Sequence, residues 1–433
     1  MHKYFMIKLL LTILGATLTI AIQAQSVLEE IRQNITLTSS NYMAYPGPKQ
    51  KKLTPAPKGM KPFYISHYGR HGSRYHSKPS LYNAPYLTLH HADSLGKLTP
   101  LGKEVMMQLE RVCKDADNHW GDLTPLGALQ QEQIAKRMME RFPEVFRGRA
   151  NVEARSTGVS RCVLSMEHAL LQMTRMNPQL NIYMEATHRD MSFLNQQDKK
   201  LFFMKKNQES TDLYNEYVKR YKKSDRLTYS LFNDSAYVHQ YVDVADFDMS
   251  LMLVTAILPN MELGKQIDLF HLFTPEEAYE IWKIGNVYWY IGWGASGIQK
   301  GLQPYTQRNL LRKLINDADS CIQQPNTNVQ LRFGHETVLL PLVCLLDLNG
   351  YGVQLDNLDL LEENGWVNYR IFPMASNVQF IFYRKNPNDR DVLFKVLLNE
   401  NEATLPLPSE QAPYYKWSDF RNYYLKKLDA YQE

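Results

Sequence analysis

Cysteine, net charge and long hydrophobic runs are all scarce in this sequence. Four cysteines among 433 residues are too few to hold a scaffold together, which excludes the class of small disulfide-rich proteins. A formal net charge of +4 gives no reason to expect nucleic acid as a partner. A mean hydropathy of −0.41 excludes a protein with several membrane spans. Hydrophobic residues at 44% and charged residues at 22% exclude a disordered chain.

The N-terminus carries the one long apolar run, which has the features of an export signal. Lys3 and Lys8 supply positive charge, residues 9–22 are apolar or small, and Ala24 before Gln25 offers a cleavage point. The run is too short to cross a membrane. We therefore expect residues 1–24 to be a signal peptide and the mature protein to be periplasmic or extracellular. The alternative is an uncleaved anchor.

Short apolar strands alternate with helical patterns along most of the chain, which predicts an α/β fold. The strand candidates are Phe63–His67, Asn151–Arg155, Val329–Phe333, Asn377–Tyr383 and Val392–Leu398. Residues 190–315 differ, because they are aromatic, helical in pattern and poor in alternation. We therefore predict an α/β catalytic domain made of residues 25–189 and 316–433, split by an α-helical insertion at residues 190–315.

Two near-repeats, at residues 98–102 and 123–127, each read Leu-Thr-Pro-Leu-Gly. A threonine followed by proline is typical of the first turn of a helix. Thr274 is followed by Pro-Glu-Glu, which predicts a capped helix start. These segments therefore indicate three helix starts and no internal domain repeat.

Residues suited to catalysis follow three of the predicted strands. The segments are Arg70-His71-Gly72-Ser73-Arg74, Arg155 to Arg161, and Gly334-His335-Glu336-Thr337. Ligands of open α/β sheets bind beyond the carboxyl ends of the strands, so we expect the three segments to meet. Guanidinium groups match phosphate oxygens, and a helix N-terminus also favours anions. The sequence therefore predicts one arginine-rich anion site.

The residue types in this site suit phosphoryl transfer through a phosphohistidine. Positive charge on both sides of His71 disfavours its protonation and leaves a lone pair free to attack phosphorus. Glu336 would protonate the leaving oxygen, and a bound dianion beside it should raise its pKa in favour of that role. The oxygens of the transferred group would be held by Arg70, Arg74, Arg161 and His335.

These blocks also carry a family resemblance. Arg70 to Arg74 resembles the signature of the histidine acid phosphatases, which form branch 2 of the histidine phosphatase superfamily. Arg155-Ser-Thr with Arg161, and Leu-Thr-Pro-Leu-Gly at residues 123–127 before it, are similar to that family's second block. His335-Glu336-Thr337 resembles its proton-donor block. Tyr75, and Leu397-Leu-Asn-Glu near the end, resemble the multiple inositol polyphosphate phosphatases and related phytases.

The resemblance implies a fold like that of phosphoglycerate mutase, with a central mixed sheet flanked by helices and an inserted, mainly α-helical cap. It implies a phosphohistidine on His71, a proton donor at Glu336, and no metal or other cofactor. It also implies phosphate ligands at Arg70, Arg74, Arg161 and His335. The donor block of the family is commonly His-Asp, or His-Ala-Glu in the inositol branch, and the adjacent His335-Glu336 pair differs from both.

The start of the predicted insertion is strongly basic. Residues 199–226 contain nine Lys or Arg against four Asp or Glu, a net charge of +5. One interpretation is a basic rim that gathers a polyanion, and the alternative is a solvated helix face. The candidate substrate-binding residues are Lys78, Arg189 and Lys205. Lys78 falls where related phytases carry a substrate-binding lysine.

Several other residues are better explained by structure than by chemistry. Arg155 is expected to brace its loop through an ion pair, because Arg161 takes the phosphate-ligand position. Cys162 and Cys344 are expected to be buried thiols. The aromatic residues of the insertion are expected to form its core (Trp282, Tyr288, Trp289, Tyr290 and Trp293). The histidines around His71 fit no zinc spacing, and the neighbouring arginines would repel a cation.

Three functional hypotheses remain. The first is an exported phosphomonoesterase that hydrolyses inositol polyphosphates such as phytate. The second is a broad acid phosphatase for sugar phosphates or nucleotides, and the third is a non-catalytic envelope protein that binds phosphate or acidic glycans. We favour the first, with a small anionic phosphorylated substrate, a monomeric protein, no nucleic-acid partner and no membrane span.

Overall fold

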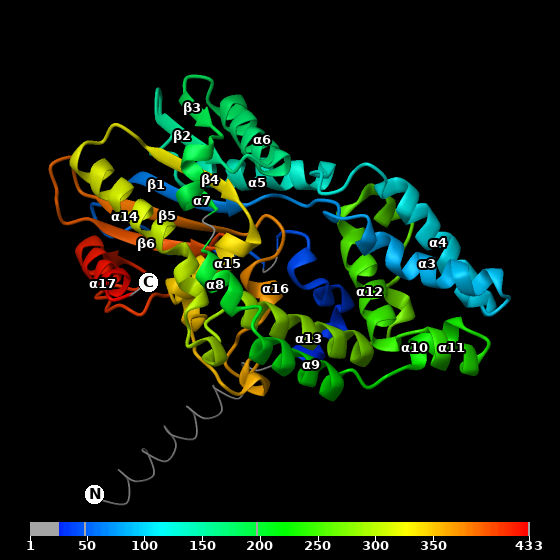
Figure 1. Cartoon of the computed structure of the whole chain (residues 1–433). Coiled ribbons are helices and arrows are strands. Elements are labelled where there is room, and N and C mark those ends of the chain that lie inside the picture. Colours follow the sequence, from blue (N-terminus) through cyan, green and yellow to red (C-terminus); the bar gives the residue numbers. More distant parts are fainter. Residues whose placement is uncertain (1–25, 47–48, 196–197, 432–433) are drawn as a thin grey trace, which may run out of the picture.

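The computed structural model describes residues 26–46, 49–195 and 198–431, so the predicted signal peptide lies outside the described residues. An eight-stranded sheet runs through one half of the molecule (Figure 1), with strand order β3-β2-β4-β1-β5-β6-β7 and β8 paired to β6. The strands are β1 (Lys61–Arg70), β2 (Asn151–Ser156), β3 (Asn181–Glu185), β4 (Val329–Gly334), β5 (Asn377–Arg384), β6 (Leu393–Leu398), β7 (Asn401–Ala403) and β8 (Tyr415–Lys416).

The sheet is mixed, which confirms the predicted fold class. β3, β2, β4 and β1 are parallel, whereas β5 pairs antiparallel with β1 and β6 antiparallel with β5. The five predicted strands are β1, β2, β4, β5 and β6. The missed strands are short edge strands, and β3 shows why, since every one of its residues is at least partly exposed and it lacks an apolar run.

Both faces of the sheet are covered by helices. Successive residues of a strand point to opposite faces, so neighbouring residues of a central strand pack into different cores. Tyr64 and Ile65 are neighbours in β1 and both fully buried, yet they belong to different cores. Ile65 packs with α5 (Pro125–Arg141) and α6 (Ser160–Met176). Tyr64 packs with α14 (Arg308–Gln323), α15 (Glu336–Leu345) and α17 (Trp417–Asp429). The central strands are therefore buried on both sides.

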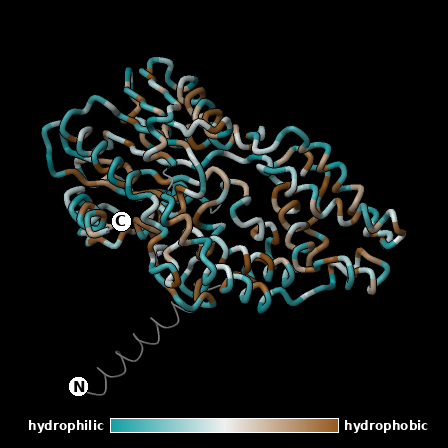
Figure 2. Tube along the Cα trace, in the orientation of Figure 1, coloured by the Kyte–Doolittle hydropathy of each residue, from teal (hydrophilic) through white to brown (hydrophobic). Residues whose placement is uncertain are grey.

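A second, helical part of the molecule lies to the right in Figure 1. Its core joins α3 (Ser80–Ser94) and α4 (Pro100–Ala116) to α10 (Arg226–Leu231) and α12 (Val244–Ile257). In Figure 2 these helices carry hydrophobic residues along part of their surface and hydrophilic residues elsewhere, as expected for amphipathic helices around a shared core. Two helices before residue 190 thus share a core with the predicted insertion, while the domain boundaries at 190 and 315 stay a prediction.

The remaining helices connect and flank these two parts. They are α2 (Val27–Gln33), the 3-10 helix η1 (Ile35–Tyr42), α7 (Met191–Leu194), α8 (Lys199–Met204), α9 (Gln208–Tyr221), α11 (Ser235–Tyr241), α13 (Pro275–Trp293) and α16 (Asn368–Ile371). Within the described ranges, no helix combines the length and the apolar character that a membrane span needs. All four cysteines lie in the described part of the chain and none is in a disulfide, and Cys162 and Cys344 are buried as predicted.

The three predicted helix starts are confirmed. Thr99 and Thr124 cap α4 and α5 by accepting hydrogen bonds from the backbone N–H of Gly102 and Gly127. A proline at the first position needs no hydrogen-bond partner there. Thr274 forms a complete capping box at the start of α13. The two Leu-Thr-Pro-Leu-Gly segments thus form the same threonine-capped helix N-terminus.

The glycine of the second repeat also sets how closely α5 approaches the loop after β1. A Cβ on Gly127 would lie 2.1 Å from the backbone oxygen of Ser73, and one on Gly72 would lie 2.2 Å from the backbone oxygen of Gly127. Neither backbone atom can rotate away. The two glycines therefore let the loop at residues 71–74 lie directly against the N-terminus of α5.

Gly127→Ala should destabilise the protein. The added methyl would push the loop away from α5, and overpacking of this kind costs about 3 kcal/mol. Gly285→Ala, in the middle of α13, is the matched control, because nothing lies within 4 Å of its added methyl and alanine is the better helix former by about 1 kcal/mol. Urea unfolding followed by circular dichroism measures both, and equal stability of the two variants would contradict this account.

Candidate active site

The carboxyl ends of three parallel strands meet at one edge of the sheet and bring the predicted segments together. The backbone N–H of His71 donates to the carbonyl of Gly334 at 2.9 Å, which joins the loop after β1 to the end of β4. The backbone N–H of Thr157 donates to the carbonyl of Phe333 at 3.0 Å, which joins the loop after β2 to the same strand. Three stretches far apart in sequence thus share one network of backbone hydrogen bonds.

His71 is buried with one ring nitrogen paired and the other free. Nδ1 lies 2.8 Å from the carbonyl of Gly72, and because a carbonyl can only accept, the N–H of the neutral ring is on Nδ1. Nε2 has no hydrogen-bond partner among the described residues. Burial, together with Arg70 and Arg74, holds the pKa of His71 well below its ordinary value despite the opposing effect of Glu336. Nε2 therefore carries a lone pair at neutral pH.

Arg70, Arg74 and Arg161 each carry a buried donor that has no hydrogen-bond acceptor among the described residues. Arg70 is fully buried, and its Nη1 donates to the carbonyls of Asn41 and Phe372. Its Nη2 lacks a hydrogen-bond acceptor among the described residues, as do Nε of Arg74 and Nε of Arg161, whereas its Nε lies in an ion pair with Glu336. A buried donor without an acceptor costs about 1–3 kcal/mol. Such a cluster of donors is expected only where an anion binds.

Glu336 is the carboxylate of the site. Its Oε2 lies 3.1 Å from Nε of Arg70 and 3.5 Å from Nε2 of His71, and its Oε1 lies 3.7 Å from Nη2 of Arg74. Burial raises the pKa of Glu336, but Arg70, then His71 and Arg74, more than offset burial and bring the pKa well below its ordinary value. Without a bound anion, the Glu336 carboxyl is therefore ionised. The raised pKa expected from the sequence concerns the site with a dianion bound.

His335 lies at the N-cap position of α15, facing the loop after β2. Its Nε2 is 3.2 Å from the hydroxyl of Thr157. Burial lowers the pKa of His335 to about 4. Glu336 raises this pKa, and Arg161, Arg70 and Arg74 lower it further. The Cys162 thiol lies 3.8 Å from the His335 ring, a proximity that the sequence pattern did not reveal, and burial raises the pKa of that thiol to about 11. Cys162 is thus buried, as predicted, and protonated.

The same residues include one arrangement with the composition of a metal site. Ligand atoms of His71, His335 and Glu336 all lie within 4.8 Å of one another. The three guanidiniums beside them oppose a cation. The donor set therefore fits an anion much better than a metal ion.

The 3-10 helix η1 contributes two residues to the site that sequence analysis missed. Asn41 accepts the hydrogen bond from Arg70 through its carbonyl. The ring of Tyr42 lies 5.6 Å from the guanidinium carbon of Arg74 and 4.8 Å from the ring of His76. Asn260, from the helical part, donates to the Tyr42 carbonyl. No local pattern in residues 35–42 indicates these long-range contacts.

The Leu-Leu-Asn-Glu segment that resembles the inositol phosphatase branch holds the other support of Arg70. Asn399 donates to the carbonyls of Arg370 and Ile371 and accepts from the N–H of Asn377. These bonds fix the stretch that contains Phe372, whose carbonyl accepts from Arg70. Asn399 itself has a φ of 51°, in the left-handed region that asparagine tolerates better than most residues.

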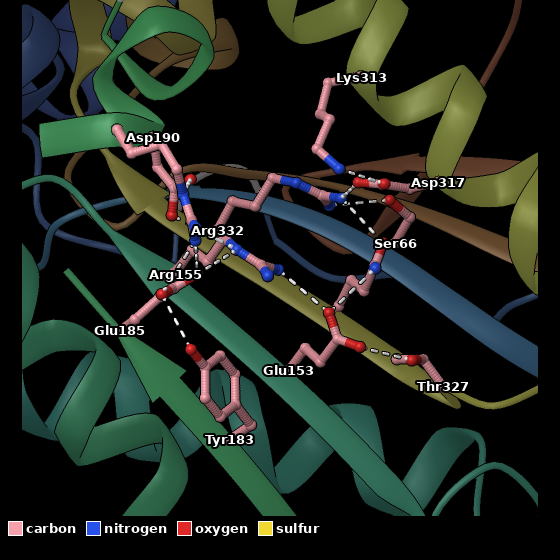
Figure 3. Close-up of polar contacts among 12 residues, drawn as sticks. Ser66, Glu153, Arg155, Tyr183, Glu185, Asp190, Lys313, Asp317, Thr327 and Arg332 are labelled. Atoms are coloured by element: carbon pink, nitrogen blue, oxygen red, sulfur yellow. Dashed lines mark hydrogen bonds and ion pairs between the residues drawn. The ribbon is translucent and has the colours of Figure 1, made fainter. Parts of the chain in front are cut away.

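Arg155 and Arg332 are neighbours on β2 and β4 but serve the fold, as predicted for Arg155 (Figure 3). Arg155 pairs with Glu153 at 3.1 Å, Glu185 at 3.0 Å and Asp190 at 3.5 Å. Arg332 pairs with Asp317 at 2.6 Å. Arg155 and Arg332 have no carboxylate in common, whereas Arg70 and Arg74 share one, Glu336.

The three candidate substrate-binding residues lie in different surroundings. Lys78 is exposed just before α3. Arg189 is 75% exposed and pairs with Glu185 and Asp190 beyond the edge strand β3, so its charge is already neutralised. Lys205 lies with Nζ 4.1 Å from the ring centre of Trp293, and burial together with Lys206 lowers the pKa of Lys205 to about 8. Substrate binding by any of them stays a prediction.

The aromatic group of the insertion is only partly a core. Trp282 and Tyr290 are fully buried, but Tyr288 is 48% exposed. Its ring lies 5.6 Å from that of Trp293, and burial with a contribution from Tyr42 raises the pKa of Tyr288. Tyr288 thus lies on the surface of this aromatic group, which corrects the expectation that it belongs to the core of the insertion. Its position in α13 turns it away from the packed face.

A mixed α/β sheet with an arginine-lined imidazole at its carboxyl edge is an arrangement suited to the transfer of phosphoryl groups. The family model of the histidine phosphatase superfamily (branch 2) matches residues 69–399. The chain therefore belongs to that family and is a phosphoric monoester hydrolase. No curated protein sequence matches it.

Solved structures with the same fold include phytases at low sequence identity. A multiple inositol polyphosphate phosphatase from Bifidobacterium longum, in complex with inositol hexasulfate, is 17% identical, with a TM-score of 0.74 over 89% of this chain and 96% of its own. The phytase from D. castellii is 14% identical, with a TM-score of 0.65 over 92% and 85%. The phytase from Hafnia alvei is 14% identical, with a TM-score of 0.51 over 86% and 98%.

Proposed function

We propose that this phosphatase hydrolyses inositol polyphosphates, phytate among them, through a phosphohistidine on His71. The observation that carries the mechanism is the unprotonated Nε2 of His71 beside the unpaired donors of Arg70, Arg74 and Arg161. A fully buried neutral imidazole is a poor proton shuttle at neutral pH, but it can attack phosphorus. The non-catalytic hypothesis loses its support with the family membership.

In the first half-reaction, Nε2 of His71 attacks phosphorus while the bond to the ester oxygen breaks. The guanidiniums and His335 hold the three equatorial oxygens as their charge develops. The carbonyl of Gly72 accepts the hydrogen bond from Nδ1–H throughout, so the ring stays oriented and can carry positive charge. Protonated Glu336 gives its proton to the leaving alcohol.

In the second half-reaction, water attacks the phosphohistidine from the side that the alcohol has left. Glu336 is now a carboxylate and takes a proton from that water, as microscopic reversibility requires. The N–P bond breaks, the electron pair returns to Nε2, and inorganic phosphate is released. His71 regains the lone pair with which it began.

The substrate proposal is supported by the charges of Lys205 and Lys206. Lys205 contacts the rings of Phe202 and Trp293 and Lys206 contacts Phe202, where they face no carboxylate partner in the described ion pairs. A second phosphate group on the substrate would find positive charge there. The fold is also that of enzymes whose solved structures include an inositol hexasulfate complex.

One observation favours the broader acid phosphatase as the second candidate. Arg220, Lys222 and Arg226 of the basic segment are already paired, with Asp359, Asp248 and Glu277 respectively. Less of the net charge of +5 is therefore available to a polyanion than the sequence suggests. Export through a signal peptide at residues 1–24 is a further part of the proposal, and it rests on the sequence alone.

His71→Ala should abolish turnover of inositol hexakisphosphate, by at least about a thousandfold, because it removes the nitrogen that attacks phosphorus. Phosphate release measures this, and quenching wild-type enzyme with alkali during turnover should trap phosphate on a histidine. The control is His91→Ala, on the exposed surface of α3. Turnover by His71→Ala at the wild-type rate would end the proposal.

Glu336→Gln should slow substrates with poor leaving groups far more than those with good ones. Alkyl esters such as β-glycerophosphate need a proton on the leaving oxygen, whereas p-nitrophenyl phosphate needs little help. We expect about a hundredfold larger loss of kcat for the alkyl ester. Equal losses on both substrates would argue against Glu336 as the proton donor.

Lys205→Met should raise KM for inositol hexakisphosphate about fivefold to tenfold and leave KM for p-nitrophenyl phosphate unchanged, because only the former carries a second phosphate group. Lys199→Met is the matched control, with the same change of charge at the exposed first position of α8, the helix that Lys205 caps at its other end. The same substrate panel separates the two functional candidates. If glucose 1-phosphate is hydrolysed as efficiently as inositol hexakisphosphate, the broad acid phosphatase is the correct description.

A further inference from the structure

The carboxylate of Glu336 lies where the transferred phosphoryl group has to bind. Its Oε2 is 3.5 Å from the attacking nitrogen of His71 and 3.1 Å from Nε of Arg70, and its Oε1 is 3.7 Å from Arg74. A phosphoryl group in line for attack places its phosphorus beyond the same nitrogen and its oxygens on the same guanidinium groups. The two anionic groups therefore cannot occupy these positions together.

The arginines, and not His71, hold the carboxylate in this position. The neutral ring of His71 has its N–H on Nδ1, so Nε2 has nothing to donate to Glu336, and the pair is not hydrogen-bonded. What remains is the attraction between a buried carboxylate and the guanidiniums of Arg70 and Arg74, which is strong where water is excluded. This attraction is the one that an incoming phosphate has to match.

We propose that Glu336 is an internal competitor for the phosphate pocket, which a substrate or product anion must displace from Arg70 and Arg74. The proposal rests on the proposed function only in taking a phosphate-like dianion as the ligand. It gives Glu336 a role in setting anion affinity that is separate from proton donation. It also implies that the carboxylate weakens the hold on inorganic phosphate and so favours product release.

Displacement would also change the protonation of Glu336. The titratable and charged groups that act on it are Tyr68, Arg70, His71, Arg74, Arg161, Cys162 and His335. In the free site, Arg70 has the largest lowering effect on the pKa of Glu336, followed by His71 and Arg74. A carboxylate moved off Arg70 and placed beside a bound dianion is expected to take up a proton from solvent. That proton is the one it would donate to the leaving alcohol.

Sulfate binding tests the proposal without turnover. Sulfate is a dianion throughout the accessible pH range and cannot be hydrolysed, so any proton taken up on binding comes to the protein. Calorimetric titrations from about pH 5 to pH 8, in two buffers of different ionisation enthalpy, give both the affinity and the proton uptake. In wild type, sulfate should bind more weakly as pH rises, by up to about tenfold per pH unit, with proton uptake approaching one.

Glu336→Gln should bind sulfate at least about tenfold more tightly than wild type at neutral pH, with little pH dependence and no proton uptake. Glu336→Asp keeps the charge but shortens the reach, so its affinity should fall between the two. Glu140→Gln makes the same change of charge at an exposed position of α5 and should behave as wild type. Melting temperatures confirm that each variant is folded.

Three results would overturn the proposal. The first is that Glu336→Gln binds sulfate no more tightly than wild type. The second is that Glu336→Gln still takes up a proton on binding, which would assign that proton to a histidine. The third is that neither protein binds sulfate. Each is distinct from failure of the proposed function, which would appear as absence of a phosphohistidine in wild type while the sulfate results hold.

Discussion

Burial of positive charge around one imidazole is the constraint on which the rest of this structure depends. Arg70, Arg74 and Arg161 bring three guanidiniums close to His71, with a single carboxylate among them. Taking an ion out of water costs several kcal/mol even after the protein relaxes. The fold offsets this cost by lending backbone carbonyls to the guanidiniums, such as those of Asn41 and Phe372 to Arg70. Positions that supply those carbonyls are as important as the arginines.

This requirement explains why distant segments are tied so tightly to the sheet edge. Asn399 fixes the stretch before Phe372, and the next residue, Glu400, is fully buried and paired with Arg137 and Arg141. On the opposite side, Ser73 donates to Asn260, which in turn donates to the carbonyl of Tyr42. The sheet domain and the helical part thus share hydrogen bonds within a few residues of the site. A rigid pocket keeps the charges from reorganising as the reaction proceeds.

The parts of this site that sequence reasoning recovered are those with a local signature. β1 and β4 end directly before His71 and His335, β2 ends five residues before Arg161, and parallel strands place their carboxyl ends at one edge. The roles of Asn41 and Tyr42 could not be read in this way, because they arise from packing between residues hundreds of positions apart. The close approach of Gly72 and Gly127 belongs to the same class. The short strand β3 was missed because it is exposed and lacks alternation. The sequences of α3 and α4 do not indicate that these helices pack against helices that follow residue 190.

The unpaired cysteines have a practical consequence. Cys162, Cys321 and Cys344 are buried, and burial raises the pKa of each thiol to about 11 or 12, so none is poised to react. No covalent crosslink contributes to the native state. The polypeptide can therefore reach that state without an oxidant or an isomerase, and material made in the reducing interior of an expression host should be as well folded as material recovered from outside a cell.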